Sequence, residues 1–206
     1  MLKYKNKMEN TMNTDLNRNL YLVKEHVGMF KAANNYDIYD PETNEIIMEC
    51  REENLGIFTK LLRFTDYKRM TPFDVQVRTT DGRQVVRVRR GISIFLSKVE
   101  VFDEKDRVIG LFKQKFFSIG GAFTVFDTNE EPVCQLKGKW TGWDFKFMTG
   151  ETELAHVSKK WAGLGKELFT SADNYVLSIS EKIPAAHVAR KLIMAAVMCI
   201  DMVLKE

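Results

Sequence analysis

The stretch Ala185–Leu204, AAHVARKLIMAAVMCIDMVL, contains no glycine or proline and reads as one helix. Within it, Leu192–Ile200 is apolar without a break, whereas an ordinary surface helix keeps a polar face. A membrane span needs about 20 mostly apolar residues, and this run is roughly half as long and ends at Asp201. We therefore expect a helix that is buried on every side in a protein core, in preference to a membrane span.

The chain before this helix repeats a hairpin motif. Val99–Asp103 (VEVFD) and Phe123–Asp127 (FTVFD) are the same strand, and each is followed by a polar turn and a second strand. Similar copies begin at Tyr36, Val75 and Phe145. Alternating apolar residues, β-branched and aromatic content, and turn residues at fixed offsets are typical of β-hairpins.

Five hairpins supply ten strands, and Leu20–Val27 and Tyr175–Ser180 add two more. A long antiparallel series tends to close, because closure removes exposed edges. A barrel of about twelve strands has an interior wider than its own side chains fill, and an apolar helix would fill it. We predict a mainly β protein, a closed antiparallel barrel of about twelve strands around a central C-terminal helix, residues 185–204. Residues 20–206 form this single domain, after an asparagine-rich leader, residues 1–19, that we expect to be disordered.

Composition narrows the function classes. With 206 residues, 45% hydrophobic and 29% charged, the chain is globular, and a net charge of +3 is too small to indicate nucleic acid binding. The three cysteines are far apart and form no CxxC pair, which argues against zinc and a disulfide framework and favours a reducing compartment. Because the N-terminus has no apolar h-region, we expect no secretory signal.

Three motifs in the C-terminal part of the chain are more specific indicators of a protein family than the hairpins are. They are Val157–Gly163 (VSKKWAG), Glu167–Tyr175 (ELFTSADNY) and the apolar helix with Cys199–Asp201 (CID). In this order they resemble the phospholipid scramblase family of the Tubby C-terminal-like superfamily, with its SKxWxG and FTDADNF stretches and its helix ending near Ile-Asp. The match is collinear from about residue 20 to the end. The resemblance implies a membrane-associated protein that moves phospholipids between leaflets or binds them.

Some positions depart from the family pattern, so the chain looks like a short form. The leader has no proline-rich arm, and Arg90–Ser97 has no cysteine where relatives carry a palmitoylated cluster. The family's proposed calcium segment leaves only Asp173, Asn174 and Glu181 here. Calcium takes six to eight oxygen ligands, so these three residues make a weak calcium candidate, and we expect no required cofactor.

Basic residues recur at one equivalent position of successive second strands: Arg89, Lys113, Lys137 and Lys159. Basic or bulky neighbours accompany them, namely Arg87, Arg90, Lys115, Lys139, Lys160 and Trp161. We interpret these ten residues as a lipid-binding band that attracts anionic headgroups by about 1 kcal/mol per cation. Trp140 and Trp143 nearby suit a membrane interface. The alternative is a solvated outer face with tryptophans in the core.

A second membrane hypothesis concerns the apolar link Ile92, Ile94, Phe95 and Leu96, at the place where relatives carry lipidated cysteines. An exposed apolar loop of this kind can dip into a bilayer. The alternative is an ordinary strand that pairs within the barrel.

No motif indicates an enzyme. His26, His156 and His187 are scattered, and the sequence has no GxSxG, HExxH or P-loop. We expect a non-enzymatic scramblase-family protein, peripheral on the cytosolic face of anionic phospholipid membranes. The alternative is a soluble anionic-lipid or protein-binding module of Tubby-like fold without transport activity. Low net charge argues against a third option, nucleic acid binding.

Overall fold

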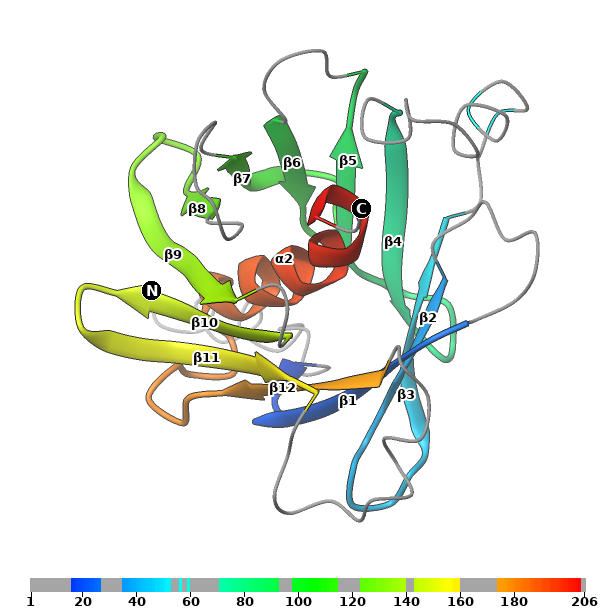
Figure 1. The fold of residues 1–206 in the computed structure, drawn as a ribbon. Coiled ribbons are helices and arrows are strands. Elements are labelled where there is room, and N and C mark those ends of the chain that lie inside the picture. Colours follow the sequence, from blue (N-terminus) through cyan, green and yellow to red (C-terminus); the bar gives the residue numbers. More distant parts are fainter. Residues whose placement is uncertain are drawn as a thin grey trace, which may run out of the picture.

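The computed structural model describes residues 16–26, 35–52, 56, 59, 71–92, 98–114, 123–139, 143–159 and 174–204. In this part of the chain twelve antiparallel strands form one closed barrel, in which each strand pairs with its neighbours in sequence and β1 pairs with β12 (Figure 1). The barrel around a C-terminal helix confirms the predicted fold class.

The first six strands are β1 Leu20–Glu25, β2 Tyr36–Tyr39, β3 Ile46–Arg51, β4 Phe73–Thr79, β5 Gln84–Arg90 and β6 Lys98–Phe102. The second six are β7 Val108–Gln114, β8 Phe123–Phe126, β9 Pro132–Lys139, β10 Asp144–Thr149, β11 Thr152–Ser158 and β12 Asn174–Ile179. All five predicted hairpins are present, and the two additional predicted strands appear as β1 and β12.

The repeated aspartate at the end of the first strand of a hairpin has a structural role. Asp40, Asp103 and Asp127 each accept a hydrogen bond, at 2.8–2.9 Å, from the backbone N–H two residues further along the chain. A short side chain that bonds its own turn in this way replaces a backbone contact and stabilises a tight reversal. The sequence repeat is therefore explained, in part, by turn formation.

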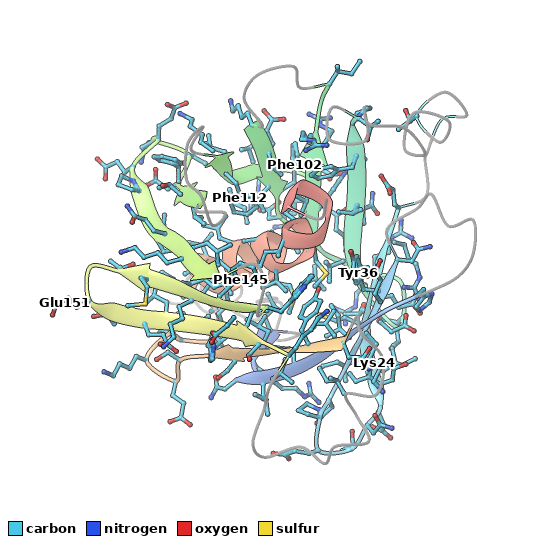
Figure 2. The ribbon with its side chains drawn as sticks, viewed as in Figure 1. Lys24, Tyr36, Phe102, Phe112, Phe145 and Glu151 are labelled. Carbon is cyan, nitrogen blue, oxygen red and sulfur yellow. The ribbon has the colours of Figure 1, made fainter. Side chains whose placement is uncertain are left out.

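The C-terminal helix, α2 (Val188–Leu204), lies inside the ring of strands (Figure 1). Every residue from Leu192 to Ile200 is at most 6% exposed. Inward-facing side chains such as Tyr36, Phe112 and Phe145 pack in the same core, whereas Lys24 and Glu151 lie on the outside (Figure 2). The helix is thus buried on every side along this run, as its unbroken apolar sequence predicts. No helix in the described ranges is long and apolar enough to cross a membrane.

Close contact between α2 and the barrel wall depends on Gly110 in β7. A Cβ atom at this position would lie 2.8 Å from a methyl carbon of Leu192 and 2.4 Å from the backbone oxygen of Phe126. Both distances are too short for a real side chain, so only glycine lets β7 lie this close to both neighbours.

The helix begins three residues later than predicted. Ala185 and Ala186 form a turn after Pro184, and the first helical residue is Val188. The ring atom Nδ1 of His187 accepts a hydrogen bond from the N–H of Ala189 at 3.2 Å. His187 therefore acts as the N-cap residue, because it satisfies one of the N–H groups that a helix start leaves without an intrahelical partner.

Arg190 fastens the helix to the chain before β1. Its guanidinium is 3% exposed and donates hydrogen bonds to the backbone oxygens of Leu16 and Arg18, at 3.0 and 2.6 Å. It also bonds the side-chain oxygen of Asn19, at 2.6 Å, and the oxygen of Ile183. Leu16, Arg18 and Asn19, predicted to belong to the disordered leader, are thus hydrogen-bonded to α2 through Arg190, and Leu16 is only 2% exposed.

Candidate membrane-binding collar and end pocket

The two ends of the barrel differ in charge. The five hairpins turn at one end, here called the turn end, and the remaining strand connections lie at the opposite end, here called the loop end. The five hairpin turns, residues 40–45, 80–83, 103–107, 127–131 and 150–151, contain eleven carboxylate residues and three cationic ones. The turn end is therefore strongly acidic.

Cationic side chains gather near the loop end instead. We define the collar as Arg89, Lys98, Lys113, Lys137 and Lys159, each within two residues of the loop end of β5, β6, β7, β9 or β11. Four of them were predicted from the repeat. Lys98 was not, although it opens β6 and lies directly opposite Lys113 in the β6–β7 pairing.

Three collar cations lie over aromatic rings. The guanidinium carbon of Arg89 is 4.9 Å from the ring centroid of Phe102, and Nζ of Lys113 is 5.0 Å from that of Phe126. Nζ of Lys159 is 4.2 Å from the ring of Trp143. Phe102 points away from the core yet is only 8% exposed, beneath the side chains of Arg87 and Arg89. An apolar base with a cationic tip suits an interface between oil and water.

Carboxylates partly neutralise the collar. Glu100 pairs with both Arg89, at 3.2 Å, and Lys98, at 4.0 Å, and Glu130 pairs with Lys113 at 2.7 Å. The hydrogen bond from Lys113 holds the pKa of Glu130 below its usual value. Exposed pairs of this kind contribute little stability, so the collar cations remain available to other anions.

Arg87, another predicted lipid-binding residue, is engaged more firmly. It donates two hydrogen bonds to the carboxylate of Asp74, at 2.8 and 2.6 Å, and lies 3.3 Å from Asp106. The hydrogen bonds to Asp74 raise the pKa of Arg87 above its usual value. The bidentate geometry indicates a strong pairing within the protein.

Of the remaining predicted band residues, only Arg90 has a side chain that the structure describes. Arg90 is 3% exposed and faces the inside of the barrel, because side chains alternate along β5. Lys139 ends β9 and its side chain is not described. Lys115, Lys160 and Trp161 lie outside the described residues. Among the predicted band residues with described side chains, Arg89, Lys113, Lys137 and Lys159 thus belong to the collar, whereas Arg90 lies inside the barrel.

The structure describes only some of the tryptophans and apolar-link residues that were predicted to contact a membrane. Trp143 is half-buried and stacks on the core residue Tyr175, with ring centroids 5.7 Å apart. Its ring also contacts the collar residue Lys159. Ile92 is 77% exposed, and the rest of the apolar link, Ile94 to Leu96, lies outside the described residues. Trp140 also lies outside them.

The calcium candidates do not come together. Asn174 opens β12 and Glu181 follows its far end, so the strand separates them by about 20 Å at about 3.3 Å per residue. One calcium ion binds its ligands at about 2.3–2.6 Å, so Asn174 and Glu181 cannot share it. Asp173 lies outside the described residues. Within the described ranges, no three His, Cys, Asp or Glu side chains are grouped to hold a metal ion.

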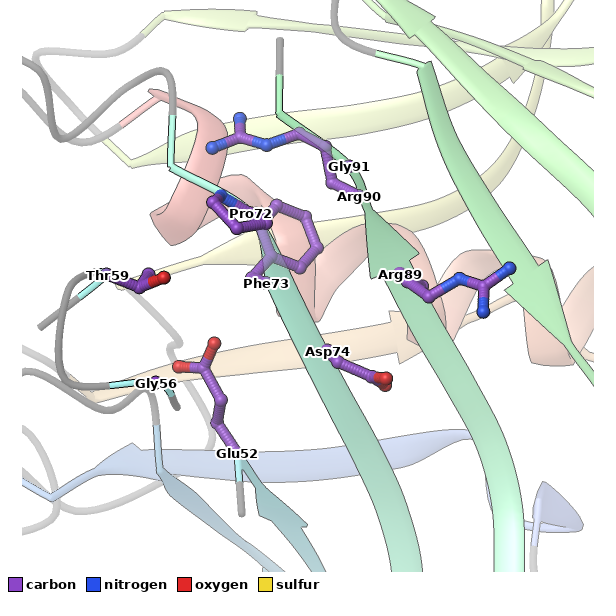
Figure 3. A pocket seen from close by; sticks show the side chains of 9 residues that line it. All are labelled: Glu52, Gly56, Thr59, Pro72, Phe73, Asp74, Arg89, Arg90 and Gly91. Carbon is purple, nitrogen blue, oxygen red and sulfur yellow. The ribbon is translucent and has the colours of Figure 1, made fainter. Parts of the chain in front are cut away.

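A pocket of about 270 Å³ lies at the loop end, where β3 ends, β4 begins and β5 ends (Figure 3). Its described lining is Glu52, Gly56, Thr59, Pro72, Phe73, Asp74, Arg89, Arg90 and Gly91. Glu52 was not among the predicted site residues. Strand alternation could have found it, because Met48 and Cys50 of β3 face the core and Glu52 continues their face.

Cysteine and histidine side chains act as nucleophiles or bases in many enzymes, but here the cysteines are buried and two of the histidines are paired with carboxylates. All three cysteines are buried and free, and burial raises the pKa of Cys50 and of Cys134 to about 12 and that of Cys199 well above its usual value. Thiols with raised pKa values are poor nucleophiles. His26 and His156 pair with the carboxylates of Asp37 and Asp144, each at 2.6 Å.

Comparison with known proteins identifies the family. The family model for scramblases matches residues 12–206. The chain belongs to the scramblase family. It is 23% identical to human phospholipid scramblase family member 5 over 120 residues, which is 50% of this chain and 44% of that protein. It is 22% identical to human phospholipid scramblase 2 over 161 residues, which is 71% of this chain and 52% of that protein. The chain thus spans about half the length of the curated relatives it matches.

The fold of this scramblase-family chain recurs in a solved structure. A protein of Arabidopsis thaliana, determined by X-ray crystallography, matches 92% of this chain and 95% of its own, with a TM-score of 0.53 and 15% identity. The likeness at this identity concerns the fold alone. The scramblase family is not a family of catalytic enzymes.

Proposed function

We propose that this scramblase-family chain is a peripheral membrane protein that binds anionic phospholipid on the cytosolic face and takes part in phospholipid movement between leaflets. The observation that carries the proposal is the charge asymmetry of the barrel. The collar cations lie near the loop end, where Lys159 lies over the ring of Trp143, and eleven carboxylates lie in the hairpin turns at the opposite end.

This asymmetry both attracts and orients the barrel at an anionic surface. Each Lys or Arg near such a surface contributes about 1 kcal/mol, and the attraction decays within a Debye length. The acidic turn end is repelled by the same surface. The loop end therefore faces the membrane, with Trp143, which directly precedes β10 at that end, near the headgroups, where aromatic rings are favoured.

A second candidate, a lipid-binding module without transport activity, is favoured by α2. The helix and the inward-facing side chains of the strands fill the described interior, so a lipid has no path along the barrel axis while α2 stays in place. Transport through this chain requires either a route along the outer surface or departure of α2 from the core. Binding requires neither.

Vesicle co-sedimentation tests the membrane proposal. We expect the protein to sediment with phosphatidylcholine vesicles that contain phosphatidylserine and to stay in solution with phosphatidylcholine alone. Raising the salt concentration to about 1 M, where the Debye length is about 3 Å, should release it. Lys137→Glu should weaken binding about fivefold or more, because each cation contributes about 1 kcal/mol.

Lys105→Glu is the matched control, because Lys105 is equally exposed but lies at the turn end. Equal losses from Lys137→Glu and Lys105→Glu would contradict docking through the loop end. Transport is tested by reconstitution into liposomes with a fluorescent phospholipid reporter. Exchange above that of empty vesicles supports leaflet transfer, and binding without exchange supports the module.

A further inference from the structure

One stretch of the outer wall of the barrel is open, where β9 and β10 lie side by side (Figure 1). The described outward side chains of these two strands are exposed or half-buried, namely Pro132, Gln135, Lys137, Asp144, Lys146 and Met148. On β1 and β12, by contrast, Leu22 and Val176 face outward opposite each other and are 0% exposed. The outer face of β9 and β10, here called the open wall, is thus a sheet face that no other described element covers.

Opposite charges stand at the two ends of β9. Lys137 lies two residues before the loop end of the strand, and Glu131 directly precedes the strand at the turn end. Both side chains are exposed, and neither forms an ion pair with another described residue. Six residues of strand hold them about 20 Å apart, so they cannot pair with each other within one chain.

The surroundings of Lys137 and Glu131 extend this charge difference. The turn before β9, residues 127–131, and the turn after β10, residues 150–151, contain four carboxylate residues and no cationic one. Near the loop end, Lys146 lies directly opposite Lys137 in the β9–β10 register. Asp144, the only carboxylate within β9 and β10, is bonded to His156 at 2.6 Å. The open wall therefore has a cationic half and an anionic half.

Apolar side chains lie beside these charges. Pro132 is exposed and lies directly opposite Phe126 of β8, which is half-buried. Met148 of β10 is also half-buried and lies opposite Gln135. Aromatic residues and methionine are enriched at protein–protein interfaces, and exposed apolar groups rimmed by polar ones mark such surfaces.

We propose that the open wall binds a second copy of this chain, in a two-fold dimer whose barrels run antiparallel. A two-fold axis that crosses β9 near Cys134 lays the strand antiparallel on its own copy. Because Cys134 is midway between Glu131 and Lys137, Lys137 of each copy then meets Glu131 of the other. The contact forms twice, as in every two-fold interface. The inference does not depend on the proposed function, since the dimer needs no lipid.

The expected contact is small and closed. Three strands with a spacing of about 4.8 Å span only about 10–15 Å, so the interface is smaller than the about 1,200 Å² that stable complexes bury. We therefore expect a weak dimer whose population depends on concentration. A two-fold contact stops at two copies, whereas a head-to-tail contact between the cationic and anionic ends would continue into larger assemblies.

Sedimentation equilibrium of the full chain without lipid measures the association. In low salt, from micromolar to millimolar protein, the average mass should rise from that of one chain towards that of two. In about 1 M salt, where the Debye length is about 3 Å, the dimer should dissociate over most of this range. A mass that stays at one chain in low salt, or that rises beyond two chains, would overturn the inference.

Charge reversal identifies the surfaces that meet. Lys137→Glu and Glu131→Lys should each weaken the dimer about tenfold or more, because each places like charges together at both copies of the contact. An equimolar mixture of the two variants should associate about as tightly as the natural chain, because every contact again joins opposite charges. Lack of recovery in the mixture would contradict the antiparallel pairing.

Two matched controls reverse charges away from the open wall. Lys105→Glu lies in the β6–β7 turn and Glu42→Lys in the β2–β3 turn, and both residues are exposed. Neither change should alter the dimer. Equal weakening by these controls would show that net charge, and not the open wall, governs association.

Vesicle sedimentation separates this inference from the proposed function. Glu131→Lys leaves every collar cation in place, so it should break the dimer and keep binding to vesicles that contain phosphatidylserine. Vesicle binding by a chain that is monomeric at every concentration overturns the dimer and leaves membrane docking intact. A dimer with the expected response to charge reversal, formed by a chain that binds no vesicles, supports the dimer and contradicts membrane docking.

Discussion

Arg190 of α2 donates a hydrogen bond, at 2.6 Å, to the side chain of Asn19, which lies 171 residues earlier in the chain. The same guanidinium bonds the backbone oxygens of Leu16, Arg18 and Ile183. The central helix is thus fastened to the entrance of the first strand by one buried side chain.

Replacement of Arg190 by lysine should destabilise the fold by about 3–5 kcal/mol. Lysine has three donors in place of five and lacks the planar fork, so buried oxygens would lose their partners at about 1–3 kcal/mol each. Chemical denaturation monitored by circular dichroism measures the loss in the free energy of unfolding. Arg83→Lys, at an exposed turn, is the control, and an unchanged midpoint for Arg190→Lys would show that the contacts are dispensable.

Gly110→Ala should destabilise the protein by about 1–3 kcal/mol, because the added Cβ meets both Leu192 and the backbone oxygen of Phe126. Gly91→Ala, with open space around its Cβ, should have little effect. In the double variant Gly110→Ala/Leu192→Ala, the clash with Phe126 remains, so the stability lost through Gly110→Ala is not restored. Thermal unfolding of the four proteins, including the natural one, tests the expectation, and full rescue by Leu192→Ala would contradict it.

Asp103 should make stability depend on acid pH. Burial by itself raises the pKa of Asp103, but hydrogen bonds from Arg107 and from two backbone N–H groups outweigh it and hold the pKa below its usual value. A carboxyl with a lowered folded-state pKa stabilises fully above its unfolded value of about 3.9, and the stabilisation is lost as pH falls through the folded value.

Asp103→Asn should therefore cost about 1–3 kcal/mol at neutral pH, and its difference from the natural protein should shrink as pH falls below about 4. Urea denaturation across this pH range measures the difference. Glu151→Gln, at an exposed turn, serves as the control. A gap between Asp103→Asn and the natural chain that is constant down to the lowest pH would contradict the assigned titration.

Calcium should not raise the melting temperature, because Asn174 and Glu181 lie at opposite ends of β12. Binding to the folded state alone would raise it by mass action. Thermal unfolding with millimolar calcium and with chelator makes the comparison. Calcium stabilisation that Glu181→Gln abolishes would show that Glu181 binds calcium after all.

The hairpins could be predicted because their signals are local. Strand alternation and the turn aspartates Asp40, Asp103 and Asp127 repeat with the chain, and each aspartate bonds a backbone group two residues away. Most of the collar could be predicted for the same reason. Second strands of successive hairpins run in one direction, so equivalent positions such as Arg89 and Lys113 lie at the same end of the barrel.

The partners of these residues could not be predicted in the same way. Arg89 pairs with Glu100 across the β5–β6 register, and Lys113 pairs with Glu130 beyond the next strand. Arg89 and Arg90 are adjacent in sequence but face opposite sides of the wall. Glu52 joins Arg90 only because two strand ends meet at the loop end.

The sequence by itself determined the elements of this protein: periodic strands, tight turns, and a helix whose unbroken apolar run from Leu192 to Ile200 required a core around it. Tertiary structure alone decided which charges meet, the late start of α2 at Val188, the attachment of Arg190 to the chain before β1, and the charged pocket. The spacing of apolar residues can be recognised in the sequence because it follows from the local backbone geometry of strands and helices. Hydrogen bonds and ion pairs act over a few ångströms, so they depend on register and closure, which bring distant residues together only in the folded barrel.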